Sequence, residues 1–137
     1  MSFDYLDDTF GKYRKAGSKY DEVEDKAISL IKGIVANTIS FDEIAKGFNE
    51  VRIRLLELSN KSIDQEFPLW LNLFLGNVFY KWHQWHLLRK MHTEDPEKFN
   101  EPGMEEQYQR IVNMGYDDMF IDKCQYCLEE LKNAQKI

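Results

Sequence analysis

Apolar side chains recur at steps of three and four along most of the chain, and no stretch sustains the alternation of a β-strand. The longest such run is Phe67 to His92, which contains all three tryptophans and all three histidines but no acid. Pro68 suits the first turn of a helix, where its missing N–H needs no partner, and the next proline is Pro96. The pattern therefore predicts one long helix over about 68–92, enclosed by other helices along its first half.

Shorter segments with the same spacing predict the remaining helices. Ser40 with Glu43 forms a capping-box pattern, and Ser18 with Asp21 resembles one. We expect an all-α single domain over residues 1–137, a bundle of five or six helices with the tryptophan-rich helix at its centre and the second and third helices antiparallel. Besides 68–92, the expected helices cover residues 3–13, 20–37, 41–58, 104–114 and 117–134.

The charge distribution narrows the classes of partner. The net charge is −6, and residues 93–137 alone contain 11 acids and five bases. A chain this acidic lacks the basic footprint of a nucleic-acid binder and favours a cationic partner. The uncharged run over residues 67–80 is too short for a membrane span, which needs about 20 apolar residues. Two cysteines and the absence of a signal-peptide pattern at the N-terminus predict a reducing, cytoplasmic setting.

Two pairs of side chains raise the alternative of a zinc site. His83 and His86 are three residues apart, as are Cys124 and Cys127, so each pair would share one helix face. If the two faces met, they would present a tetrahedral Cys₂His₂ site that stabilises a helical domain. Against this, both cysteines lie on an apolar stripe of the last helix, where free cysteine behaves as a small buried side chain. We therefore expect no metal and no other cofactor.

The second half of the 68–92 helix mixes basic and aromatic side chains. Lys81, Arg89 and Lys90 alternate there with tryptophans and histidines, which could form a patch for an anionic ligand. The competing interpretation is that the tryptophans are core and the basic groups pair with the abundant acids of residues 93–137. We favour internal pairing, because it accounts for the segregated charge without a ligand.

One passage is similar to a known family. The sequence from Leu30 to Leu58 resembles the opening of small helical immunity proteins of the colicin D type, on the positions Ile39, Ser40, Glu43, Ile44 and Phe48. The resemblance covers about a fifth of the chain and excludes the tryptophan-rich helix. It implies a protein that binds a toxin, such as a basic RNA-cleaving domain, and covers its active site with acidic side chains.

No catalytic motif accompanies these features, because the glycines are isolated and there is no nucleophile elbow or HExxH sequence. We therefore expect a non-enzymatic protein that neutralises a basic partner, as an immunity protein or antitoxin does. The alternatives are the zinc-stabilised domain above and a helical adaptor or subunit of a larger complex. The partner-binding residues that we predict cluster near Gly115, where the acidic excess is greatest: Glu105, Glu106, Asp117, Asp118 and Asp122.

Overall fold

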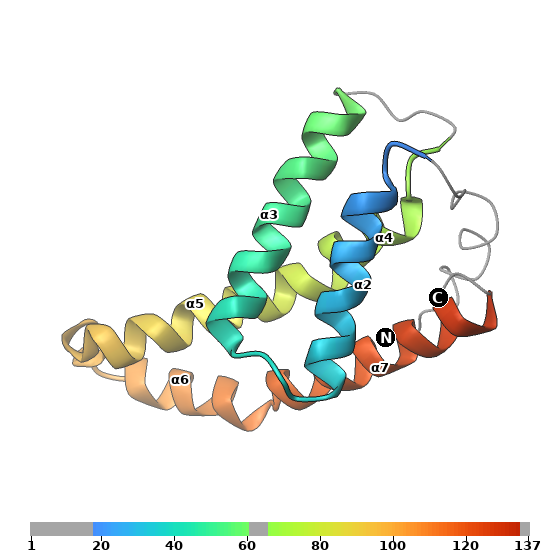
Figure 1. Ribbon diagram of the computed structural model, residues 1–137. Helices are drawn as coiled ribbons and strands as arrows, with labels where there is room; N and C mark the ends of the chain where they lie inside the picture. The colour runs from blue at the N-terminus through green and yellow to red at the C-terminus, as the bar shows by residue number, and fades with distance from the viewer. Residues whose placement is uncertain (1–17, 61–65, 135–137) are drawn as a thin grey trace.

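The computed structural model describes residues 18–60 and 66–134, and these residues form helices joined by short connections (Figure 1). The all-α prediction is confirmed, since no strand occurs in the described ranges. The expected helix at residues 3–13 lies outside them, so the predicted count of five or six cannot be compared member by member. The α-helices are α2 (Asp21–Val35), α3 (Phe41–Ser59), α4 (Leu69–Phe74), α5 (Tyr80–Glu94), α6 (Met104–Asn113) and α7 (Tyr116–Asn133), with a π-helix η1 (Leu75–Phe79) and a 3₁₀ helix η2 (Pro96–Phe99).

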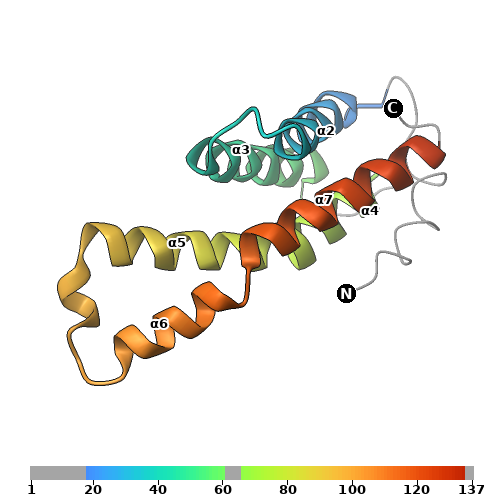
Figure 2. The ribbon, with the colours of Figure 1, turned by 90° about the horizontal axis from the view of Figure 1, so that it is seen from below.

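The antiparallel pair α2 and α3 forms one layer, and α7 crosses the helical run of α4, η1 and α5 beneath it (Figure 2). The capping box predicted at the start of α3 is present, because the Ser40 hydroxyl accepts from the Glu43 N–H and the Glu43 carboxylate accepts from the Ser40 N–H. Acids in the first turn of α2 add favourable charge at the positive end of that helix. The Ser18 cap predicted for α2 is not present, because the N-cap of that helix is Tyr20 and makes no side-chain capping hydrogen bond, whereas α3 begins at its predicted cap.

The predicted central helix runs without a break through α4, η1 and α5, but it is not uniform. In η1 the Tyr80 N–H donates to the Leu75 carbonyl, five residues back. Buried residues follow one another at steps of four along this run, from Trp70 through Phe74 and Val78 to Trp82. A regular α-helix would rotate such positions progressively off one face, and the wider π turn counters that drift. The π segment therefore keeps both halves of the helix directed at one core.

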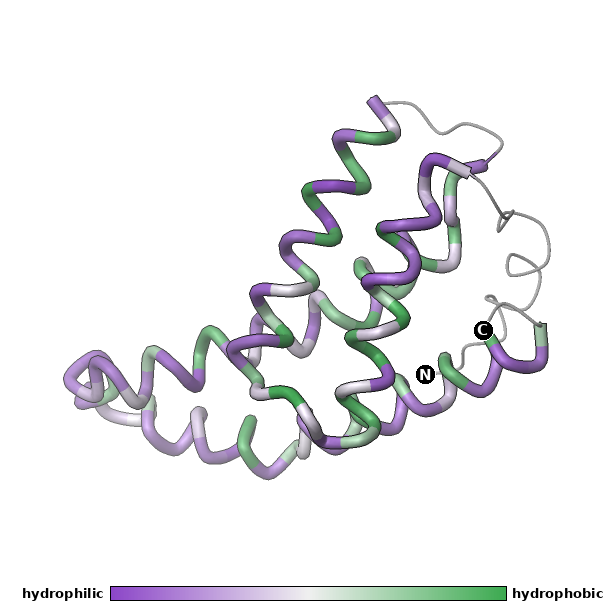
Figure 3. Tube along the Cα trace, in the orientation of Figure 1, coloured by the Kyte–Doolittle hydropathy of each residue, from purple (hydrophilic) through white to green (hydrophobic). Residues whose placement is uncertain are grey.

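The hydrophobic core is one cluster that draws on every helix. The largest side chains without exposed surface include Trp70, Trp82 and Phe48, which come from α4, α5 and α3. A buried carboxylate lies among them, because Glu24 of α2 accepts a 2.9 Å hydrogen bond from the Trp70 indole N–H. Apolar residues recur along α2 and α3, whereas the end formed by α6 and the last turns of α5 is more polar (Figure 3).

Candidate functional site

The polar side of α5 is tied to the first turn of α7 through one carboxylate. Asp117 accepts a 2.7 Å hydrogen bond from the Trp82 indole N–H, and its second oxygen accepts from the Arg89 guanidinium at 2.5 Å. The guanidinium also lies over the Phe41 ring, 4.5 Å from its centroid. Asp117, predicted as a partner contact, is therefore part of the internal structure.

The same arginine continues the network toward α3. Its other terminal nitrogen lies 2.9 Å from Nδ1 of His86, and Nε2 of His86 lies 2.9 Å from the Asp42 carboxylate. Because a guanidinium can only donate, Nδ1 must accept, and the hydrogen of a neutral His86 is on Nε2, where it donates to Asp42. Lys90 reaches the same carboxylate at 3.2 Å. The hydrogen bonds from His86 and then Lys90 lower the pKa of Asp42.

A second contact joins the end of α5 to α6. His92 lies 2.7 Å from the carboxylate of Glu105, which also accepts a 3.0 Å hydrogen bond from Gln109. These two hydrogen bonds, that of Gln109 first, lower the pKa of Glu105. The His92 ring stacks on Tyr108 with centroids 3.7 Å apart. Glu105, another predicted partner contact, is thus engaged within the molecule although its side chain remains half exposed.

Internal pairing accounts for most of the basic groups on α5, as favoured from the sequence. The acids that pair with Arg89 and His92 belong to residues 93–137, as expected. The acid that pairs with His86 and Lys90 is Asp42 of α3, which the charge pattern did not indicate. Sequence spacing could not reveal this acid, because its position depends on how α3 crosses α5.

The other predicted partner contacts are free for a partner. Glu106, Asp118 and Asp122 are exposed, and no ion pair with another described residue engages them. Asp118 and Asp122 are four residues apart on the outward side of α7. Two exposed methionines accompany them, Met114 at 57% and Met119 at 44% relative exposure. We call Asp118, Asp122, Met114 and Met119 the acidic face; Glu106 lies in the first turn of α6, at the end of that helix remote from α7.

The alternative zinc site is wrong for the described part of the chain. No group of three or more histidine, cysteine, aspartate or glutamate side chains there could hold a metal ion. His83 stacks on Phe79 with centroids 5.0 Å apart, and both ring nitrogens of His86 are occupied. Cys124 and Cys127 are buried, and burial raises the pKa of Cys124 well above its usual range and that of Cys127 to about 12. Burial therefore disfavours the thiolate, which is the form that binds zinc.

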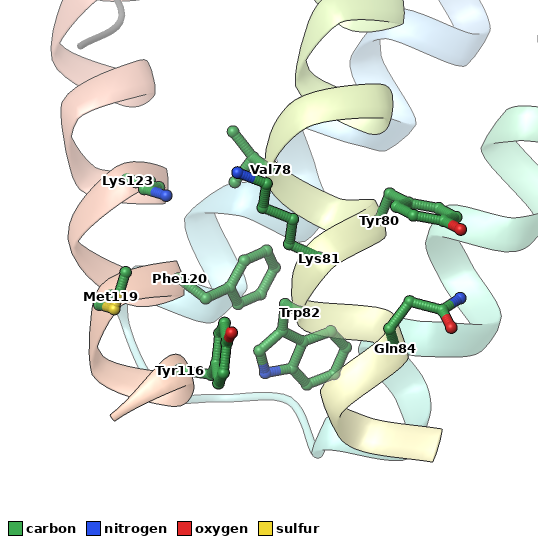
Figure 4. Close-up of a pocket in the computed structure, with 9 residues that line it drawn as sticks. All are labelled: Val78, Tyr80, Lys81, Trp82, Gln84, Tyr116, Met119, Phe120 and Lys123. Carbon is green, nitrogen blue, oxygen red and sulfur yellow. The ribbon is translucent and has the colours of Figure 1, made fainter. Parts of the chain in front are cut away.

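A cleft that sequence reasoning missed lies between α5 and α7 (Figure 4). Its volume is about 400 Å³, within the range of small-molecule pockets. Trp82 and Phe120 close its floor with stacked rings whose centroids are 4.8 Å apart. Its lining also includes Val78, Tyr80, Lys81, Gln84, Tyr116, Met119 and Lys123. The sequence analysis placed Lys81 in the basic aromatic half of α5, but nothing in the sequence indicated a role for Lys123. Only the tertiary fold brings these two helices together.

Within residues 18–60 and 66–134, no helix has the length and apolar character that a bilayer crossing requires. Comparison of the chain with protein-family models, curated proteins and solved structures gave no match.

Proposed function

We propose that this protein binds and neutralises a basic partner protein through the acidic face, in the manner of an immunity protein or antitoxin. The main evidence is that Asp118 and Asp122 lie one turn apart on α7, where two like charges repel each other. No cation among the described residues forms an ion pair with either of them. A partner cation placed between them would remove this repulsion. The resemblance of Leu30–Leu58 to immunity proteins stays a prediction that agrees with this role.

The start of α7, which carries these acids, is held in place by contacts within the molecule. Gly115 adopts a left-handed conformation, with φ of 68°, which ends α6 and allows α7 to begin at the next residue. Two residues later Asp117 anchors the start of α7 to Trp82 and Arg89. A surface fixed in this way loses little conformational entropy when it binds. The internal contacts of Asp117 thus support the role of its neighbours.

The exposed methionines add apolar area beside the charges. Met114 and Met119 flank the turn, and methionine adapts readily to partners of different shape. A basic segment with apolar side chains would match both components of the surface. The helical adaptor remains the second candidate, favoured by these methionines, because apolar contact alone does not require a basic partner.

Association kinetics would test the proposal. The product of each adjacent reading frame would be expressed with a tagged copy of this protein, and a copurifying basic protein would be the partner for stopped-flow measurement at low and moderate salt. Replacing Asp118 and Asp122 by asparagine should slow association at low salt and flatten its salt dependence, because peripheral charges act mainly on encounter. Asp117 is left intact in this variant, since its carboxylate is structural.

A charge-matched control separates the acidic face from net charge. Glu22→Gln with Glu129→Gln also removes two exposed acids, from α2 and from the far end of α7, and should leave association nearly unchanged. Equal effects of both double variants would show that only net charge steers the partner. A partner whose association does not depend on salt would favour the adaptor instead.

A further inference from the structure

Two lysine side chains, from α5 and from α7, line the α5–α7 cleft, and no acid of residues 18–60 or 66–134 pairs with either of them. Figure 4 shows Lys81 of α5 and Lys123 of α7 reaching toward one another, with the rings of Trp82, Phe120 and Tyr116 beside them. No aspartate or glutamate is among the described residues that line the cleft, and neither lysine forms an ion pair with a described residue.

This arrangement is unfavourable in the empty protein. Partial burial, followed by the nearby charge of Lys81, lowers the pKa of Lys123. Elsewhere on α5 the cations are neutralised, since Arg89 meets Asp117 and Lys90 meets Asp42. The chain has 24 acids for 18 lysines and arginines, yet no acid of the described residues lines the cleft beside these two lysines. Departures from local charge balance of this kind occur at functional sites.

The rest of the cleft favours an apolar, flat body. Trp82 and Phe120 have almost no exposed surface and form a closed floor. Tyr116 and the exposed Met119 provide accessible walls of aromatic and thioether character. Ligand sites commonly combine such apolar walls with a few polar groups that fix orientation. Here the polar groups that would fix the orientation of a ligand are the two ammonium groups, whose positive charges favour an anion between them.

We propose that the α5–α7 cleft binds a small organic anion, whose carboxylate or phosphate bridges Lys81 and Lys123 while its flat apolar body lies between Tyr116 and Met119. Binding neutralises the lysine pair and covers apolar side chains that are otherwise in contact with water. The cleft shares Met119 with the acidic face but differs from it in charge and in the ligand it takes, so this site does not depend on the proposed neutralising function.

1-Naphthyl phosphate is a suitable probe, with inorganic phosphate and 1-naphthol as the two halves of its structure. In a sample with ¹³C-labelled methionine methyl groups, titration should shift the Met119 resonance, because the naphthyl ring would lie beside it. The intact probe should bind at least tenfold more tightly than either half. A Met119 resonance that does not saturate, or equal affinity for 1-naphthol, would overturn the proposal.

Lysine variants test the charge requirement. Lys81→Gln with Lys123→Gln should weaken the probe at least tenfold, whereas Lys32→Gln with Lys132→Gln removes two exposed cations elsewhere and should change affinity less than twofold. If the half-buried Lys123 proves necessary for folding, Lys81→Gln alone should still weaken binding several-fold. Unchanged affinity in the cleft variants would refute the site. The Asp118→Asn and Asp122→Asn protein should bind the probe at least as well as the original, so failure of one proposal is distinguishable from failure of the other.

Discussion

Replacing Asp117 by asparagine should destabilise the fold, whereas the same change at the adjacent Asp118 should not. The Asp117 carboxylate accepts from Trp82 and from Arg89, and only 29% of its side chain and 22% of the arginine's are exposed. Asparagine can still accept one hydrogen bond, but it removes the charge opposite the guanidinium and presents an amide that cannot accept from it. Asp118 is exposed and has no such partner among the described residues.

Hydrogen bonds that involve a charged group contribute about 1.5–3 kcal/mol each, so losing the Arg89 contact should lower the free energy of unfolding by about that amount. Asp118→Asn should change it by less than about 0.5 kcal/mol, as is usual for exposed positions. Urea denaturation of the two variants measures the difference. The indole N–H resonance of Trp82 should move in the Asp117 variant only, because that group donates to the lost carboxylate.

Equal stability of the two variants would refute this account of the turn. Arg89→Met provides a second check through a double-mutant cycle, in which the two changes should be strongly non-additive. Independent effects of the two substitutions would show that the ion pair contributes nothing measurable, as is common for exposed pairs.

Three further predictions concern other parts of the fold. Gly76→Ala should stabilise the protein by about 0.5–1 kcal/mol, because a Cβ there meets no atom within 4 Å. Gly47→Ala should stabilise it less, because its Cβ would lie 2.7 Å from a methyl group of Leu30, which then has to move; urea denaturation compares the two variants. Cys127, whose pKa burial raises to about 12, should react with a disulfide reagent at pH 8 only in denaturant, and stability should fall as the pH rises above about 9, because the unfolded chain releases that proton first. Burial, then the charges of His86 and Arg52, lower the pKa of His83, so its NMR titration should have a midpoint below 6.5, and stability should fall as the pH drops below that value, because the unfolded chain binds the proton first; His83→Gln should reduce that fall.

The local features of the fold could be predicted because they depend on neighbours in sequence. The Ser40 capping box and the apolar spacing of α2 and α3 involve contacts within a few residues, and both are present. The helix predicted over 68–92 is present over 69–94, but its π segment was not predicted. The sequence feature that corresponds to this π segment is the repeated spacing of four residues between Trp70 and Trp82. This spacing indicates a π segment only once it is known that all these side chains pack into one core.

The roles of individual polar residues could not be predicted in the same way. Asp117 and Asp118 are adjacent residues of the same type, so the sequence does not distinguish them. They lie about 100° apart around α7, and Asp117 therefore pairs with Arg89 inside the molecule whereas Asp118 is an exposed charge. Likewise, Cys124 and Cys127 share one helix turn and His83 and His86 share another, as their spacing requires. The two pairs do not come together as a metal site within the described residues. Which way a helix face points is decided by packing.

From the way α6 is attached, we expect it to be a region of low local stability. Tyr108 is its buried side chain, and it is held by rings of Trp85, His92 and Phe99. The Trp85 indole N–H is buried without a hydrogen-bond partner among the described atoms. Water that enters when α6 detaches would hydrogen-bond this N–H, which offsets part of the free energy needed to detach the helix. Hydrogen exchange should therefore show the amides of α6 opening as one cooperative unit, at a lower free energy than those of α2 and α7. The two closing helices of the chain would then differ in exchange rate although a two-residue turn joins them.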